Sequence, residues 1–353
     1  MRGRIIGLIV LALVIAAGVG VAIYGFGVQD ITVVQGTITP DKADLFEDPE
    51  VQRILKWKYG LEVSYREAGS LEMIDSRKQR YDFFFTGSPV PQGILETAGI
   101  EPVSTETVFY SPLVLYSWDL VLEGTDQSGL FLKEGDFTYM DMVEYQAALQ
   151  KGASWRDMGS GAQGDVLVQT ADPGKSASAL MYYGLLGTVL NSGQGPDVAE
   201  LEALADDLRQ GLPTERMDHS ADALFKDYLR MGPGAKSMVA GYESQFLSFA
   251  YHHPTVWESV KDRMEVVYPK PTVWAEHTVI SLTEGGQRLS KALQDPDIQA
   301  RARERHGYRT GTYGQAPAEG QVMVASIPED IKYVVGQLND TTMQKLRELL
   351  QEK

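Results

Sequence analysis

ITVV (31–34), LEVSY (61–65) and YDFFF (81–85) are three short apolar runs, and small polar residues follow each of them. Runs of this length that are rich in β-branched and aromatic residues predict strands buried in a sheet. The small residues that follow the three runs are Gly36 and Thr37, Gly69 and Ser70, and Thr86, Gly87 and Ser88. The stretch 31–88 therefore predicts three strands that each end in a turn of small side chains.

Helices are predicted between these strands. Asp48 and Pro49 suit the N-cap and first turn of a helix that Gly60 closes, and a second helix is expected at 71–80. A β-α-β-α-β order is typical of a parallel sheet. In open α/β sheets ligands bind at the carboxyl ends of the strands. We expect the three turns to meet at that edge and to form one wall of a binding site.

The stretch QTADPGKSASALMYYGLLGTVL (169–190) predicts the opposite wall. A strand is expected at 166–170, and Asp172 and Pro173 suit the N-cap and first turn of a helix after it. A helix N-terminus carries a partial positive charge and free backbone N–H groups, which bind anions. The residues expected to contact a ligand in this turn are Gly174, Lys175, Ser176 and Ser178. The turn predicts a site for an anion or a small polar molecule.

The rest of the chain predicts a second α/β unit and a return to the first. Residues 108–120 (VFYSPLVLYSWDL) predict a long strand that leaves the first unit, and residues 266–282 predict a second crossing back. Further helices are expected at 141–150, 197–209, 221–230, 241–250, 286–293, 297–306 and 340–352. The expected architecture has two lobes joined by two crossover strands. Residues 29–115 with 272–353 would form the first lobe, and residues 116–271 the second.

Composition excludes several functions. The formal net charge of −16 repels phosphate backbones, so nucleic acid is not an expected partner. The chain has no cysteine, which excludes disulfides, thiolate catalysis and cysteine-ligated zinc. Its 353 residues are enough for about two folding units.

The N-terminus predicts a membrane anchor. Arg2 and Arg4 precede the uncharged stretch 5–28, and a helix that spans a bilayer needs roughly 20 apolar residues. A cleaved signal peptide is the alternative, because small residues at 16–18 offer a cleavage site. We favour an uncleaved anchor that contacts the lipid bilayer through residues 5–28. By the positive-inside rule, the bulk of the chain then lies outside the cytoplasm.

Two motifs point toward cofactor or metal chemistry, and both are incomplete. Gly159, Gly161 and Gly164 spell G-x-G-x-x-G, but a helix is expected before them and a strand after them, the reverse of a dinucleotide site. The pair Glu276–His277 lacks a third ligand at metal-site spacing. No cofactor and no metal are expected.

After the first 28 residues, the sequence resembles the type II periplasmic solute-binding proteins, and among them the molybdate-type oxyanion binders. The strands and turns at 31–88 resemble the first lobe of that family, and LQDPDIQARARERHGYRTG (293–311) resembles its closing segment. VAGYES (239–244) resembles a second-lobe turn whose tyrosine, here Tyr242, faces the cleft. The resemblance implies a two-lobe fold, a ligand between the lobes and an ABC-type permease as partner. Glu243 is expected to cap its helix or to accept hydrogen bonds from the ligand.

The sequence thus predicts a membrane-tethered, extracytoplasmic receptor that captures a small polar or anionic solute without covalent chemistry. A ligand-sensing or protein-interaction module of an envelope complex is the alternative, and permanent tethering favours it. A hydrolase or transferase that uses Glu243 and His277 is a third hypothesis. Serine hydrolase chemistry has no support, because the sequence lacks a G-x-S-x-G motif.

Overall fold

The computed structural model describes residues 30–74, 80–214, 216–311 and 327–352. The predicted membrane anchor and its signal-peptide alternative lie outside the described residues, as does half of the helix expected at 71–80. Within the described ranges, no helix combines the length and the apolar character needed to cross a bilayer.

The described strands form one sheet in the order β2-β1-β3-β9-β4-β8-β6-β5, with β7 paired to β4. β1 (Thr32–Ile38) runs parallel to β2 (Leu61–Glu67) and to β3 (Phe83–Thr86), which confirms the predicted parallel arrangement. β9 (Trp274–Ser281) is antiparallel to β3. The parallel unit at 31–88 therefore forms one end of a mixed sheet.

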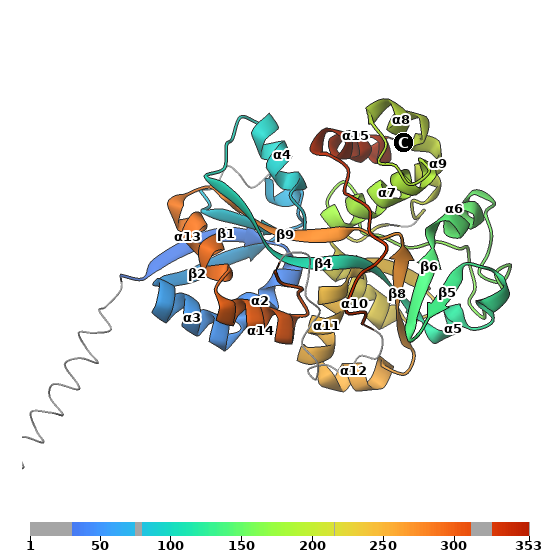
Figure 1. Cartoon of the computed structure of the whole chain (residues 1–353), viewed down its shortest axis with the longest axis horizontal. Helices are drawn as coiled ribbons and strands as arrows, with labels where there is room; N and C mark the ends of the chain where they lie inside the picture. Colours follow the sequence, from blue (N-terminus) through green and yellow to red (C-terminus); the bar gives the residue numbers. More distant parts are fainter. Residues whose placement is uncertain (1–29, 75–79, 215, 312–326, 353) are drawn as a thin grey trace, which may run out of the picture.

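The long strand expected at 108–120 is present as β4 (Ser104–Trp118), and it connects two halves of the molecule. Its first part pairs with β9, and from Leu113 onward it pairs with β7 (Met238–Tyr242) and β8 (Met264–Lys270). β6 (Phe137–Asp141) and β5 (Phe131–Glu134) complete the second half. Figure 1 shows β4 and β9 running through the middle of the molecule between two groups of helices.

We call these groups, with their strands, the first lobe and the second lobe. The first lobe contains β1, β2, β3, η1 (Pro40–Lys42), α2 (Ala43–Glu47), α3 (Pro49–Tyr59), α4 (Val90–Thr97), α13 (Glu284–Leu293) and α14 (Pro296–His306). The second lobe contains β5 to β8, α5 (Asp119–Leu122), η3 (Thr125–Gln127), α6 (Met142–Gln150), α7 (Ala177–Leu190), α8 (Val198–Ala203), α9 (Ala205–Gln210), α10 (Ala221–Met231), α11 (Glu243–His252) and α12 (Pro254–Val260).

The apolar run of β3 is buried because helices cover both faces of the sheet there. In β3, Phe83 and Phe85 pack into one core cluster, whereas Phe84 between them packs into another. Side chains alternate between the two faces of a strand, so a strand covered on both faces is apolar at every position. This explains why YDFFF (81–85) shows no polar alternation.

Helix α3 follows its sequence signals. The Asp48 carboxylate accepts hydrogen bonds from the backbone N–H groups of Glu50 and Val51, at 2.8 and 3.4 Å. Gly60 ends the helix in the left-handed conformation, with φ of 63°, which favours glycine. The predicted caps are thus confirmed.

Three local predictions in the second lobe are wrong. Residues 166–170 form no strand, and only a single bridge joins Gln169 to Val239. Helix α7 begins at Ala177 instead of Pro173, because the Asp172 carboxylate accepts from Gly174 N–H at 2.8 Å and forms a local turn before the helix. The helix expected at 197–209 is two helices, α8 and α9, which meet at Leu204.

The C-terminal part of the chain contacts both lobes. Residues 327–339, here called the C-terminal strap, run beside the crossing, where Thr272 N–H donates to Tyr333 O and Val335 N–H to Thr272 O. Helix α15 (Asp340–Gln351) then packs on α7, α8 and α9 of the second lobe and on α4 of the first. Figure 1 shows α15 beside α7 and α8. The predicted boundaries had assigned this helix to the first lobe.

Candidate ligand-binding cleft

A small cavity of about 20 Å³ lies between the two lobes. The first lobe contributes Thr39, Pro40, Asp41, Gly69, Ser70 and Gly87 to its lining. The second lobe contributes Ser176, Ser178, Ser220, Ala221, Asp222 and Tyr242. The lining therefore consists mainly of hydroxyl groups, carboxylates and glycine backbone.

Three helices of the second lobe begin at this cavity. Ser176, Ser220 and Tyr242 are the N-cap residues of α7, α10 and α11, and all three line it. The side chains of Ser176 and Tyr242 make no cap hydrogen bond, whereas Ser220 Oγ accepts from Ala223 N–H at 3.2 Å. The first backbone N–H groups of a helix lack intrahelical partners and carry partial positive charge. Three helix N-termini thus direct partial positive charge at this wall, where the Asp222 carboxylate also lies.

The first-lobe wall contains a buried hydroxyl without a partner. Thr39 is 7% exposed, lines the cavity, and its Oγ1 makes no hydrogen bond to any described residue. A buried polar group without a partner costs about 1–3 kcal/mol. A ligand oxygen in the cavity would satisfy this group.

Two carboxylates also face the cavity, and each is paired with a lysine. Asp41 forms an ion pair with Lys42, whose side chain is fully buried. Asp222 Oδ2 lies 2.7 Å from Lys226 Nζ. Burial raises the pKa of Asp222, and Asp41 and Asp44 add to that shift, while Lys226 opposes it. The cavity thus offers hydrogen-bond acceptors as well as donors.

The lobes are in contact around the cavity. Leu71 N–H donates to Lys175 O at 3.1 Å, and Ser248 Oγ donates to Asp44 Oδ2 at 3.1 Å. A Cβ atom on Gly87 would lie only 2.9 Å from Tyr242 Oη. These contacts define a closed arrangement and explain the small volume of the cavity.

The cavity brings together six of the residues predicted from the sequence. They are Gly69, Ser70, Gly87, Ser176, Ser178 and Tyr242. The Ser176 and Ser178 hydroxyls lie 2.8 Å apart. Thr86 and Ser88 are fully buried on either side of Gly87 but do not line the cavity, and Ser88 Oγ accepts from Val90 N–H at 3.2 Å.

The predicted turn at Gly36 and Thr37 is wrong, because β1 continues through both residues to Ile38. A Cβ atom on Gly36 would lie 2.4 Å from the Phe83 ring, so glycine is needed there for strand packing. The strand ends at Ile38, and the next residue, Thr39, lines the cavity in place of the predicted turn.

Gly174 and Lys175 lie in the turn before α7 and do not line the cavity. Gly174 O accepts hydrogen bonds from Arg347 of α15, at 2.7 and 3.1 Å. The Lys175 side chain is 47% exposed, and its Nζ lies 3.7 Å from Glu72 Oε1. This lysine faces the outer edge of the contact between the lobes.

Glu243 is fully buried beside the cleft and has protein partners. Its carboxylate accepts from Arg309 Nε at 2.6 Å, from Arg309 Nη2 at 3.0 Å and from Tyr268 Oη at 2.6 Å. His277 is also buried, and its ring packs edge-on against Tyr242. Burial and the nearby Lys42 hold the pKa of His277 well below its usual value. Neither Glu243 nor His277 lines the cavity, which weakens the hydrolase hypothesis.

Six lining residues were missed in the sequence: Thr39, Pro40, Asp41, Ser220, Ala221 and Asp222. Thr39 precedes Pro40, and Ser220 precedes the correctly predicted helix 221–230, so both carry the signature of an N-cap. The described residues contain no group of three His, Asp or Glu side chains arranged to hold a metal ion.

No family model and no curated protein matches the sequence. Solved structures do match the fold. The periplasmic binding protein AfuA from Actinobacillus pleuropneumoniae, with fructose-6-phosphate bound, is 13% identical, with a TM-score of 0.54 over 90% of this chain and 96% of the other. The apo ferric ion-binding protein A of Pasteurella haemolytica is 12% identical, with a TM-score of 0.54 over the same shares of the two chains.

A putative spermidine/putrescine ABC transporter protein from Listeria monocytogenes is 14% identical, with a TM-score of 0.52 over 90% of this chain and 97% of the other. These likenesses show that the chain has the fold of the type II periplasmic solute-binding proteins. The ligands after which these three proteins are described differ in charge, so the fold alone selects none of them for this chain.

Proposed function

We propose that this protein captures a small anion or polar solute in the cavity between its lobes, without covalent chemistry. In this proposal residues 5–28 tether it to the membrane, the bulk of the chain is extracytoplasmic, and an ABC-type permease receives the solute. The observation that carries the ligand class is the convergence of the N-termini of α7, α10 and α11 on one cavity. The unpartnered Thr39 hydroxyl on the opposite wall supports it.

The lining narrows the class of ligand further. Helix N-termini and hydroxyls favour negatively charged oxygens, whereas Asp41 and Asp222 accept hydrogen bonds. A ligand that presents oxygens to the helices and an O–H or N–H group to a carboxylate satisfies both. Hydrogen phosphate has both kinds of group, and sulfate has only the first.

The test is a thermal-shift titration of the full chain with phosphate and sulfate and with neutral polyols. A ligand at about 100 times its Kd stabilises the folded state by about 2.7 kcal/mol. We expect the double variant Thr39→Val with Ser176→Ala to lose that stabilisation. Lys175→Ala serves as the matched variant and should retain it, because its side chain lies outside the cavity. An equal response of the double variant and the wild type would reject the site.

A second function is favoured by the volume of the cavity, which at about 20 Å³ is far smaller than usual ligand pockets of about 300–1,000 Å³. A ligand-sensing or protein-interaction module of an envelope complex could keep the lobes closed without a solute. The same titration separates the two functions. If no solute stabilises the wild type, the interaction module is the better description.

A further inference from the structure

A second cavity of about 290 Å³ lies in the second lobe and shares no lining residue with the cavity between the lobes. Its walls come from three segments, at 155–170, 213–218 and 234–237. Small-molecule sites in proteins start at about 300 Å³. This cavity is therefore large enough for a solute of amino-acid or dipeptide size.

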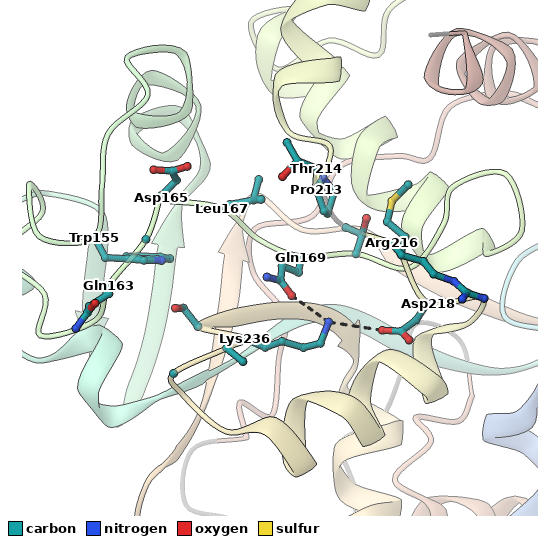
Figure 2. Close-up of a pocket in the computed structure, with 16 residues that line it drawn as sticks. Trp155, Gln163, Asp165, Leu167, Gln169, Pro213, Thr214, Arg216, Asp218 and Lys236 are labelled. Carbon is teal, nitrogen blue, oxygen red and sulfur yellow. Dashed lines mark hydrogen bonds and ion pairs between the residues drawn. The ribbon is translucent and has the colours of Figure 1, made fainter.

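Lys236 is the central polar group of this cavity (Figure 2). Its side chain is only 13% exposed, and its Nζ lies 3.1 Å from Gln169 Oε1 and 3.6 Å from Asp218 Oδ2. The distance to Asp218 exceeds the usual hydrogen-bond range of about 2.7–3.2 Å. An ammonium carries three donors. The contacts with described residues thus leave donor capacity for a ligand carboxylate.

Hydrogen bonds fix the backbone that carries these polar side chains, and Lys236 Nζ contacts both Gln169 Oε1 and Asp218 Oδ2. Lys236 O accepts from Trp118 Nε1 at 3.1 Å, and Asp218 O accepts from Asp172 N–H at 2.8 Å. Gln169 is fixed to β7 through Met238 O and Ala240 N–H. A site whose polar groups are fixed before binding loses less entropy when a ligand enters.

The charges of the cavity are separated. Figure 2 shows Lys236, Asp218 and Arg216 on one side and Asp165 with Trp155 on the other. A simple anion at Lys236 would also lie near the Asp218 carboxylate, which opposes it. A zwitterion offsets this repulsion, because its ammonium can pair with the Asp218 or the Asp165 carboxylate while its carboxylate contacts Lys236. We propose that this cavity binds a small zwitterion of the amino-acid or dipeptide class, independently of the solute in the cleft.

The test is isothermal titration calorimetry of the full chain with glycine and diglycine, and with acetate and methylamine as probes that carry a single charge. We expect saturable binding of at least one zwitterion and binding about tenfold weaker, or none, for the single-charge probes. Lys236→Met and Asp165→Asn should each weaken zwitterion binding about tenfold or more. Lys345→Met is the matched control, because Lys345 pairs with Glu202 outside this cavity.

Three results would overturn the proposal. The first is a wild type that binds neither glycine nor diglycine, and the second is a folded Lys236→Met variant that binds like the wild type. If Lys236→Met does not fold, Gln169→Leu replaces it with the same expected loss. The third is loss of zwitterion binding in the double variant Ser176→Ala with Ser178→Ala. This loss would show that the zwitterion binds in the cleft and not in the second cavity. Retained binding in that double variant supports two separate sites.

Discussion

The two lobes meet in two regions that differ in chemistry, the hinge side and the cleft. On the hinge side, Arg309 and Glu243 form a fully buried ion pair, which Tyr268 completes. At the cleft, the lobes meet through exposed or weakly held groups such as Lys175 and Glu72. Separation of the lobes at the cleft would break only weak contacts, whereas separation at the hinge side would break the buried ion pair.

The Arg309 contacts explain why the hinge side persists. Besides holding Glu243, the guanidinium donates to Pro328 O at 2.6 Å and to Glu329 O at 2.8 Å. Four of the five N–H donors of the guanidinium are thus used within the protein. By contrast, an exposed ion pair such as Lys175–Glu72 contributes about 0–1 kcal/mol.

The largest expected effect follows from breaking the hinge-side pair. Arg309→Met leaves the Glu243 carboxylate buried without its charge partner, which costs about 3–5 kcal/mol. Chemical denaturation of the full chain measures the loss in free energy of unfolding. Arg263→Met is the control, because Arg263 is half exposed and lies 3.7 Å from Asp119, and no measurable change is expected. A loss below about 1 kcal/mol for Arg309→Met would contradict the role of this pair.

An intermediate effect follows from blocking the cleft. A Cβ atom on Gly87 meets Tyr242 Oη at 2.9 Å, so Gly87→Val should keep the lobes apart. We expect the affinity for the stabilising oxyanion to fall about 100-fold, with little change in diglycine binding. Gly336→Ala is the control, because a Cβ atom there meets nothing within 4 Å. Unchanged oxyanion affinity in Gly87→Val would show that closure at this point is not needed.

The smallest expected effect is a pH dependence of the cleft. Burial raises the pKa of Asp222, so the folded state binds this proton more tightly than the unfolded state. The contribution of Asp222 to stability therefore increases as pH falls through its folded pKa. Protonation also removes a charge that repels an anion, so oxyanion affinity should rise with falling pH, by at most about tenfold per unit.

In Asp222→Asn, oxyanion affinity should depend less on pH than in the wild type. Asp126→Asn is the control, because Asp126 lies outside the cavity, and its pH profile should have the wild-type slope. Titrations with sulfate between pH 5 and 7.5 provide the measurement, because sulfate itself does not titrate in that range. Parallel slopes in the wild type and Asp222→Asn would assign the pH dependence to another group.

Local signals predicted much of the fold. The caps of α3, the strand β2, the buried run of β3 and the long strand β4 depend on residues close in sequence, and all were predicted. Gly36 was wrongly predicted to form a turn. Glycine is needed there because the Phe83 ring, 47 positions further along the chain, packs against it. The other two glycines predicted after strands, Gly69 and Gly87, do line the cavity.

Contacts between distant residues account for the remaining differences at the site. Glu243 suits an N-terminal cap, but its partner Arg309 lies 66 positions further along the chain. The exposure of the Lys175 side chain depends on how closely the lobes approach each other. The residues near Lys175 in the sequence do not indicate that distance. The same holds for the packing of α15 across both lobes.

The position of α15 has a consequence for any work on this protein. The helix contacts α4 in one lobe and α7 in the other. Its Arg347 donates two hydrogen bonds to Gly174 O, in the turn that precedes the cleft residue Ser176. If the lobes separate, α15 must therefore lose its contact either with α4 or with α7. A reporter domain or affinity tag fused to the C-terminus would lie next to these contacts. We expect it to change how often the two lobes are closed.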